Sequence, residues 1–254
     1  MEKIIAIVQA RMTSTRLPQK VLKNLAGRPV VSQVFNQLSF SKLLTDLLLA
    51  TSLDSSDDPL EKWAVENGFK FFRGDLKNVL KRFYDAAKQN NADVIVRITA
   101  DCPLIDPGVV DKVIEGFLGG KYDYFSNVNP PTFPDGLDTE VFSFTALEKA
   151  FLEAEMQSEI EHVTPYIRNH PDIFRIGNYS SLQDYSKFRW TLDNIEDYEF
   201  LKILYKNLYK ENNFIRWQDV IEFIKNHSNI LKLNAHLERN EGYIKSLNED
   251  KKIK

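Results

Sequence analysis

The chain has 254 residues, of which 43% are hydrophobic and 27% are charged, and its formal net charge is −3. This composition supports a complete core and excludes a disordered chain, and the length suits one large domain or a domain with a smaller appendage. The small negative charge gives no general attraction to nucleic acid or to an anionic membrane, so we expect neither as a partner. No apolar stretch approaches the roughly 20 residues that cross a bilayer. The single cysteine excludes an intrachain disulfide, and we expect a cytoplasmic protein.

The first half of the chain alternates short apolar runs with amphipathic segments. Predicted strands cover residues 3–10, 47–51, 69–73 and 93–100, and predicted helices cover residues 30–38, 59–67, 76–88 and 107–117. Strands and helices that alternate in this way indicate an α/β fold, with a mostly parallel central sheet and helices on both of its faces.

The second half is less regular. Its predicted strands cover residues 122–128, 139–144, 173–179 and 188–192, and its predicted helices cover residues 146–155, 196–209 and 217–224. The last 40 or so residues read as helical, rich in Lys, Asn and Glu. We therefore expect a main domain over residues 1–210 and a helical C-terminal extension over residues 211–254 that packs on it.

The loop after the first predicted strand combines positive charge with hydroxyl groups. Arg11, Arg16 and Lys20 lie within ten residues, and Ser14 lies between the two arginines. Ligands of α/β sheets bind at the carboxyl ends of the strands, where this loop begins, and Arg and Lys suit phosphate groups. The loop has no glycine, so it is neither a P-loop nor a dinucleotide fingerprint. We predict a site for a nucleoside triphosphate; the alternative is a solvated basic loop.

The run from Ala10 to Leu22 resembles the N-terminal signature of the CMP-sugar synthetases, which include the enzymes that make CMP-Kdo and CMP-sialic acid. The similarity is closer to the SpsF-like branch, named for a spore coat polysaccharide biosynthesis protein, and extends over nearly the whole chain. This resemblance implies the nucleotide-diphospho-sugar transferase (GT-A-like) fold. It implies that Arg11, Ser14, Arg16 and Lys20 hold the triphosphate. We predict that Gln9 and Ala10, at the start of the same loop, also bind the nucleotide. The family pattern has glycine where this chain has Gln19.

Two aspartates follow predicted strands. Asp101 comes directly after the strand over 93–100, and Asp193 comes after the strand over 188–192. If both strands belong to one parallel sheet, both carboxylates lie beside the phosphate loop and form a Mg²⁺ site with phosphate oxygens. The alternative is that each aspartate caps a helix.

The resemblance supports the metal site, because the family places metal-binding aspartates in an Asp-x-Pro-Leu motif and before a late helix that contains Glu-Asp. Asp101 and Asp193 match these two places. The chain has Asn194 and Ile195 where Thr-Pro is more usual. Arg11, Lys20 and Asp101 are accordingly the predicted catalytic residues.

Arg97 and Thr99 lie on the strand that leads to Asp101, and alternation along a strand places all three on one face. We predict that Arg97 and Thr99 contact the nucleotide. A charged residue inside a buried run needs a partner, so the alternative for Arg97 is an internal ion pair.

Three further residues are predicted to bind the sugar. Asp138 and Glu140 point the same way if their segment is a strand, and a Gly-x-Asp-x-Glu stretch of this kind recurs in SpsF-like sequences. The alternative is a polar hairpin face. His162 lies in a Glu-His-Val-Thr-Pro run that resembles the same branch and is a candidate general base, with a structural role as the alternative. Arg168 and Arg189 are candidate partners for a sugar carboxylate.

These observations predict a Mg²⁺-dependent cytidylyltransferase that transfers CMP from CTP to an acidic or surface-polysaccharide sugar and releases pyrophosphate. The first alternative is a sugar-1-phosphate nucleotidyltransferase that uses another nucleotide. The others are a glycosyltransferase of the same fold and a nucleotide-sensing subunit without catalysis. The tail from Leu233 to Tyr243 resembles the SpsF-like branch and is expected to cover the sugar pocket or to form a subunit contact. A homodimer is one option, because relatives are often dimers.

Overall fold

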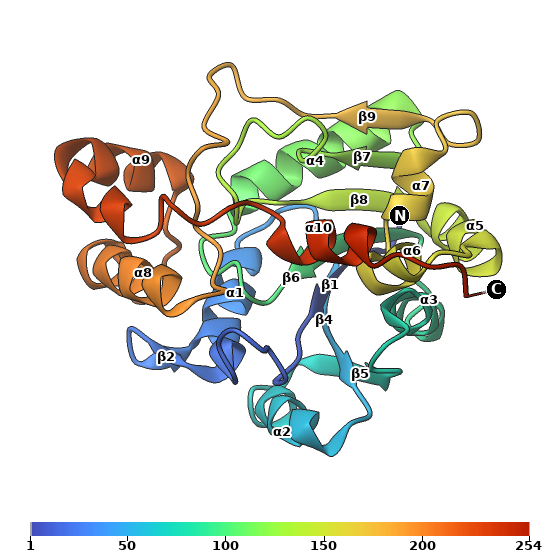
Figure 1. Cartoon of the computed structure of the whole chain (residues 1–254), viewed down its shortest axis with the longest axis horizontal. Coiled ribbons are helices and arrows are strands. Elements are labelled where there is room, and N and C mark those ends of the chain that lie inside the picture. The colour runs from blue at the N-terminus through green and yellow to red at the C-terminus, as the bar shows by residue number, and fades with distance from the viewer. Residues whose placement is uncertain (1, 254) are drawn as a thin grey trace.

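A seven-stranded sheet in the order β5-β4-β1-β6-β8-β7-β9 organises the molecule (Figure 1). The structure is a computed structural model and describes residues 2–253. The strands are β1 (Ile4–Gln9), β4 (Asp46–Ser52), β5 (Lys70–Gly74), β6 (Val94–Thr99), β7 (Tyr124–Ser126), β8 (Glu140–Ser143) and β9 (Ile176–Asn178), and a separate hairpin joins β2 (Asn24–Leu25) to β3 (Arg28–Pro29).

The sheet is mostly parallel, as the sequence predicts. Strands β5, β4, β1 and β6 pair in parallel, and β9 is parallel to β7. Only β8 runs against its neighbours, since it is antiparallel to both β6 and β7. The carboxyl ends of β1, β4 and β6 therefore lie at one edge, where the loop after β1 begins.

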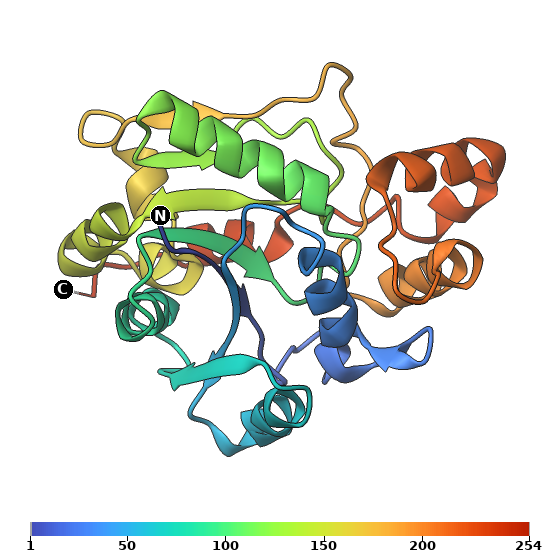
Figure 2. The same ribbon diagram turned by 180° about the vertical axis from the view of Figure 1, so that it is seen from behind.

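Helices cover both faces of this sheet. In β1, Ile4, Ala6 and Val8 enter one hydrophobic core, whereas Ile5 and Ile7 enter the other, as alternation along a buried strand requires. The first core is closed by α1 (Val30–Leu38), α2 (Asp58–Glu66) and α4 (Pro107–Gly120), and the second by α3 (Val79–Gln89), α5 (Phe144–Glu153), α6 (Gln157–His162) and α7 (Pro165–Asn169). Figure 2 shows α1 and α4 on the face opposite to α3, α5 and α6.

The C-terminal part forms a third core and then returns to the sheet. Helices α8 (Ile195–Leu208) and α9 (Trp217–Asn226) and the 3-10 turn η3 (Ser228–Leu233) pack around Trp190 and Leu192. Helix α10 (Glu241–Asn248) then packs on α6 and crosses in front of the sheet (Figure 1). Across residues 2–253, no helix combines the length and the apolar character that a membrane crossing requires.

The predicted strand over residues 188–192 is wrong. This segment is extended, but its pairing is a single bridge between Asp135 and Arg189. Strand β6 is already paired with β1 and β8 on its two sides, so no neighbouring position is left for a further strand. The segment instead crosses the end of β6, where the Leu192 amide donates to the Asp101 carbonyl at 2.8 Å. Of the strand predicted over residues 173–179, only Ile176–Asn178 form a strand, β9.

Candidate active site

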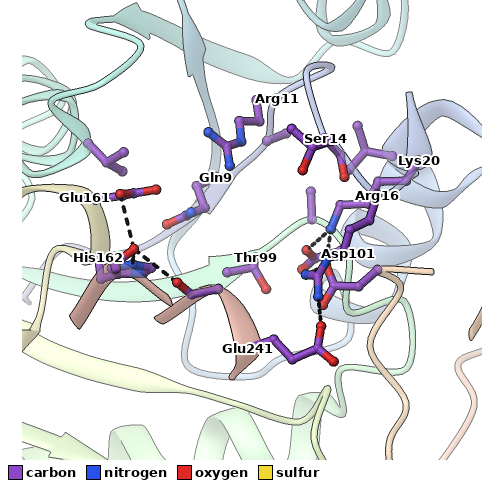
Figure 3. Close-up of a pocket in the computed structure, with 18 of the residues that line it drawn as sticks. Gln9, Arg11, Ser14, Arg16, Lys20, Thr99, Asp101, Glu161, His162 and Glu241 are labelled. Carbon is purple, nitrogen blue, oxygen red and sulfur yellow. Dashed lines mark hydrogen bonds and ion pairs between the residues drawn. The ribbon is translucent and has the colours of Figure 1, made fainter. Parts of the chain in front are cut away.

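Two adjoining cavities lie at the carboxyl edge of the sheet, and residues of α10 line both. Figure 3 shows the larger one. The larger cavity, of about 590 Å³, is lined by the loop after β1, the end of β6, α3 and α10. The smaller, of about 260 Å³, is lined by β6, β8, α7 and α10. The two linings together include all the residues predicted to be catalytic or to bind the nucleotide, the sugar or the metal, whereas Arg189 lines neither cavity. The residues are Gln9, Ala10, Arg11, Ser14, Arg16, Lys20, Arg97, Thr99, Asp101, Asp138, Glu140, His162 and Asp193.

The loop after β1 is held in shape by contacts that the motif alone does not reveal. The Gln19 backbone is left-handed, with φ of 58°, and its amide donates to the Met12 carbonyl at 3.0 Å. This explains why the family pattern has glycine here, since glycine adopts that conformation at no steric cost. The Met12 amide donates to the buried carboxylate of Asp57 at 2.7 Å, and Asp57 also accepts from Ser52. Asp57 lies in the turn after β4 and was not predicted as a site residue.

Lys20 brings the two predicted metal-binding aspartates together. Its ammonium donates to Asp101 at 2.6 Å and to Asp193 at 2.7 Å, and its side chain is buried. Burial opposes the charge of each group, but the ion pairing outweighs burial, so that the pKa of Lys20 is raised and the pKa of Asp101 is lowered to about 2. Both side chains are therefore charged at neutral pH.

Neither aspartate caps a helix. Helix α4 is capped by Asp106, and α8 is capped by Asn194 in a capping box with Asp197. The capping alternative for Asp101 and Asp193 is therefore wrong. Both carboxylates are left to face the cavity, as Figure 3 shows for Asp101.

Arg16 is neutralised by acidic side chains. It pairs with Asp193 at 2.9 Å and with Glu241 of α10. Glu241 was not predicted as a site residue, because its contact with Arg16 joins segments that are 225 residues apart. Lys20 and Arg16 together meet three carboxylates, so this end of the cavity carries no excess of positive charge.

Arg11 differs from Arg16 and Lys20. Its side chain is exposed, and it makes no hydrogen bond or ion pair with the other residues between 2 and 253. Figure 3 shows its guanidinium facing the cavity beside Gln9. Arg11 is thus available to an anionic ligand.

The smaller cavity contains the internal ion pair that was the alternative for Arg97. Arg97 pairs with Glu140, and the Tyr124 and Thr164 hydroxyls each donate to Glu140 at 2.6 Å. Burial opposes ionisation of Glu140, but Arg97 and Arg168 outweigh it and lower its pKa to about 2. Both partners of the pair nevertheless line the cavity.

Two further acidic residues of the smaller cavity, Asp135 and Asp138, are partly neutralised by arginines. Asp138 pairs with Arg239, while Arg189 meets Asp135 at 3.3 Å. Burial and the nearby Asp138 raise the pKa of Asp135 to about 7, although Arg239 and Arg189 act against them.

Of the two candidate partners for a sugar carboxylate, only Arg168 remains available. Arg189 is buried, and it contacts Asp197 at 2.9 Å and Asp193 at 3.1 Å as well as Asp135. Its proposed role toward a sugar carboxylate is therefore wrong. Arg168 stacks over the Tyr243 ring at 5.3 Å, and its Nε has no hydrogen-bond partner among the described residues.

His162 is enclosed by the C-terminal helix. Its Nε2 lies 2.9 Å from the Ser246 hydroxyl, and its ring packs edge-on against Tyr243. Burial, followed by the nearby Arg97 and Arg168, lowers the pKa of His162 to about 4. A base that weak holds a proton poorly at neutral pH, and the contacts are those of a residue that anchors α10.

We expect the His162 imidazole to stay neutral from pH 8 down to about pH 5, because a pKa of about 4 lies below that range. Proton NMR of the imidazole Cε1–H signals checks this, with the His162 signal assigned by its loss in His162→Gln. A titration midpoint near 6.5 for that signal would contradict the enclosure of His162.

The chain is similar to known proteins in both sequence and structure. The family model of cytidylyltransferases matches residues 5–242. An uncharacterized protein of Methanocaldococcus jannaschii, MJ1063, is 38% identical over 92% of this chain and 96% of its own length. The spore coat polysaccharide biosynthesis protein SpsF of Bacillus subtilis is 36% identical, over 81% of this chain and 88% of its own length.

A solved structure shows the same fold. A cytidylyltransferase from Leptospira borgpetersenii superposes with a TM-score of 0.86 at 35% identity, over 91% of this chain and 97% of that one. The loop after β1, Asp101 and Asp193 all lie within residues 5–242, the range that the family model matches. The chain is therefore a nucleotidyltransferase that belongs to the cytidylyltransferase family, in its SpsF-like branch.

Proposed function

We propose that this enzyme transfers CMP from CTP to an acidic sugar, with Mg²⁺ as cofactor and pyrophosphate as the second product. The observation that carries the proposal is the pair of adjoining cavities, which meet at Asp101 and Asp193. One cavity has basic side chains suited to a triphosphate, and the other has polar and charged side chains suited to a sugar. The name of the Bacillus subtilis relative, a polysaccharide biosynthesis protein, agrees with a sugar as acceptor.

In this proposal the larger cavity receives CTP. Arg11 is free to bind phosphate oxygens, Ser14 can donate its hydroxyl although its oxygen accepts from the Leu17 amide at 3.4 Å, and Lys20 adds a fixed positive charge to the lining. Thr99 and Gln9 line both cavities beside the end of β6, so that they face the nucleoside. Because the basic side chains are already in place, binding them to phosphate requires little reorganisation.

The two aspartates fit a Mg²⁺ ion. One oxygen of each contacts the Lys20 ammonium, at 2.6 and 2.7 Å, and this closeness supports a shared cation. Carboxylates are ligands that Mg²⁺ prefers, and the ion commonly takes the rest of its shell from water and substrate phosphates. Residues 2–253 contain no group of three or more His, Cys, Asp or Glu side chains suited to a metal, so Asp101 and Asp193 would hold the ion together with the nucleotide. The bound ion would supply charge neutralisation at the phosphates.

The protein itself contributes position and charge to the transfer. A sugar hydroxyl oxygen bonds to the α-phosphorus as the bond from that phosphorus to the leaving pyrophosphate breaks, and the hydroxyl proton passes to water. Lys20 keeps Asp101 and Asp193 in place, and Arg11 stabilises the charge of the leaving group. Alignment of this kind accounts for most of the rate enhancement in phosphoryl transfer.

An acidic sugar is favoured by the free guanidinium of Arg168 in the smaller cavity. Tyr243 covers this guanidinium, and Glu241 and Gly242 line the same cavity, so we propose that the extension over residues 211–254 closes the sugar site. We also propose that the protein is cytoplasmic, and a homodimer is one option for its assembly.

Arg168→Met is expected to raise the KM for the sugar by about tenfold or more, because a charge-assisted hydrogen bond to a carboxylate is lost. The KM for CTP should stay within about twofold, since Arg168 lines only the smaller cavity. Steady-state kinetics with each substrate varied in turn measures both values. Arg175→Met, at an exposed arginine paired with Asp123, is the control. Equal increases in both KM values would contradict this role.

A thermal-shift screen tests the nucleotide. The full chain is heated with Mg²⁺ and with CTP, UTP, GTP, ATP or dTTP in turn, and a ligand that binds only the folded protein raises the Tm by mass action. We expect CTP to raise the Tm most. A larger shift with another nucleotide would favour a sugar-1-phosphate nucleotidyltransferase, and no shift with any of them would favour a glycosyltransferase or a noncatalytic role.

A further inference from the structure

Arg82 is a buried arginine on the wall of the larger cavity that the sequence analysis did not single out. It lies on α3, and only 2% of its surface is exposed. Gly74, at the end of β5, makes room for it, because a Cβ at Gly74 would lie 2.9 Å from the Arg82 Cγ. The side chain is therefore held in a fixed position that reaches the cavity.

The guanidinium of Arg82 is buried but has few hydrogen-bond partners and no ionic one within the described part of the chain. Its Nη1 donates to the Asp75 carbonyl at 3.1 Å, whereas its buried Nε has no acceptor. Among residues 2–253 it forms no ion pair. Arg189, which is about as buried, meets three carboxylates. Buried charges in proteins are normally paired, because desolvation is costly.

The nearby acidic side chains do not pair with the Arg82 guanidinium. Asp57 favours the charge of Arg82, but its oxygens are already committed to the Met12 amide and to Ser52. Burial is the main cause that lowers the pKa of Arg82, to about 10, and Arg11 acts in the same direction. Arg82 is therefore still charged at neutral pH.

The positive charge of the larger cavity that no carboxylate neutralises thus belongs to Arg11 and Arg82, and not to Lys20 or Arg16. Lys20 and Arg16 face Asp101, Asp193 and Glu241, whereas Arg11 and Arg82 have no carboxylate in contact. Two guanidinium groups with free N–H donors on one cavity favour a ligand rich in oxygen acceptors, and an anionic one above all.

We propose that Arg82 binds the nucleotide directly, by donating from its unpaired N–H groups to oxygen acceptors of the ligand. With Arg11 it forms the part of the site where positive charge is not yet neutralised. This inference rests on the proposed function, since it takes a nucleotide as the occupant of the larger cavity. It adds an α3 residue to a site otherwise built from the loop after β1 and the two aspartates.

The test compares ligand binding with stability in the full chain. Arg82→Met is expected to weaken binding of CTP with Mg²⁺ by about tenfold or more, and Arg82→Lys by less, because lysine keeps the charge but loses the fork of donors. Calorimetric titration measures the affinities. The control is Lys81→Met, which removes an exposed charge, paired with Asp85, from the same helix and should bind within about twofold of the wild type.

Stability separates ligand binding from a structural role. Arg82→Met should melt at the same temperature as the wild type or higher, because it removes a buried charge that has no ionic partner. Titration with inorganic pyrophosphate and with CMP shows which part of the ligand is contacted: weaker pyrophosphate binding places Arg82 on the phosphates, and weaker CMP binding alone places it on the nucleoside.

Unchanged affinity of Arg82→Met for CTP, pyrophosphate and CMP would overturn the proposal. If the Tm also fell, the arginine would have a structural role. A wild-type chain that binds pyrophosphate but not CTP would contradict the proposed function instead. The pyrophosphate titration would then still test Arg82, because it does not depend on the base.

Discussion

Asp101→Asn is expected to reduce kcat/KM for CTP-dependent pyrophosphate release by about 10³-fold. The amide has nearly the shape of the carboxylate but not its charge, so the contact with Lys20 weakens and the proposed Mg²⁺ ligand is lost. Removal of one preorganised electrostatic contact typically costs about 10²- to 10³-fold in rate, and loss of the metal adds to this. The measurement is a coupled pyrophosphate assay over a range of Mg²⁺ concentrations.

The control for this variant is Asp219→Asn, in the first turn of α9, where the carboxylate lines neither cavity. It should keep at least about half of the wild-type activity. If Asp101→Asn stays within about tenfold of the wild type at all Mg²⁺ concentrations, Asp101 does not hold the metal and the assignment of the site is wrong.

Arg189→Met is expected to lower the free energy of unfolding by about 3–5 kcal/mol, the typical cost of breaking a buried ion pair by removing one partner. Asp197 is fully buried and accepts from Arg189 at 2.9 and 3.1 Å, so its charge would lose its main counterion. The same arginine donates to the Glu238 carbonyl at 2.8 Å, which ties the segment before α10 to the third core. Urea denaturation at pH 8 measures the loss.

Lys187→Met provides the matched control, two residues away on an exposed side chain, and should change stability by less than about 0.5 kcal/mol. A loss below about 1 kcal/mol in Arg189→Met would show that Asp135, Asp193 and Asp197 do not depend on this arginine. That result would reopen a role for Arg189 in ligand binding.

The parallel half of the fold was predictable because its signals are local. Strand β1 is apolar up to Gln9, β6 is apolar apart from Arg97 and Thr99, and α1 extends over the predicted residues 30–38. The loop after β1 was also predictable, because Arg11, Arg16 and Lys20 lie close together in the chain.

The second half was harder to predict because an extended segment has the same alternation whether or not it joins a sheet. Residues 188–192 illustrate this, since they bring Asp193 to Asp101 without being a strand. The residues that the sequence analysis missed depend on tertiary contacts. Asp57 holds the loop from the turn after β4, Glu241 reaches Arg16 from the far end of the chain, and Arg82 reaches the cavity from inside a helix.

The most direct test of the proposed function is product analysis with the full chain, CTP, Mg²⁺ and a panel of sugars that includes ulosonic acids and neutral sugars. Mass spectrometry identifies the nucleotide product, and pyrophosphate is measured in the same reaction. We expect a CMP-sugar and equimolar pyrophosphate with a sugar that bears a carboxylate. Pyrophosphate release only with a sugar-1-phosphate, or turnover only of a nucleotide-sugar donor with an acceptor glycan, would contradict the transfer of CMP from CTP to an acidic sugar.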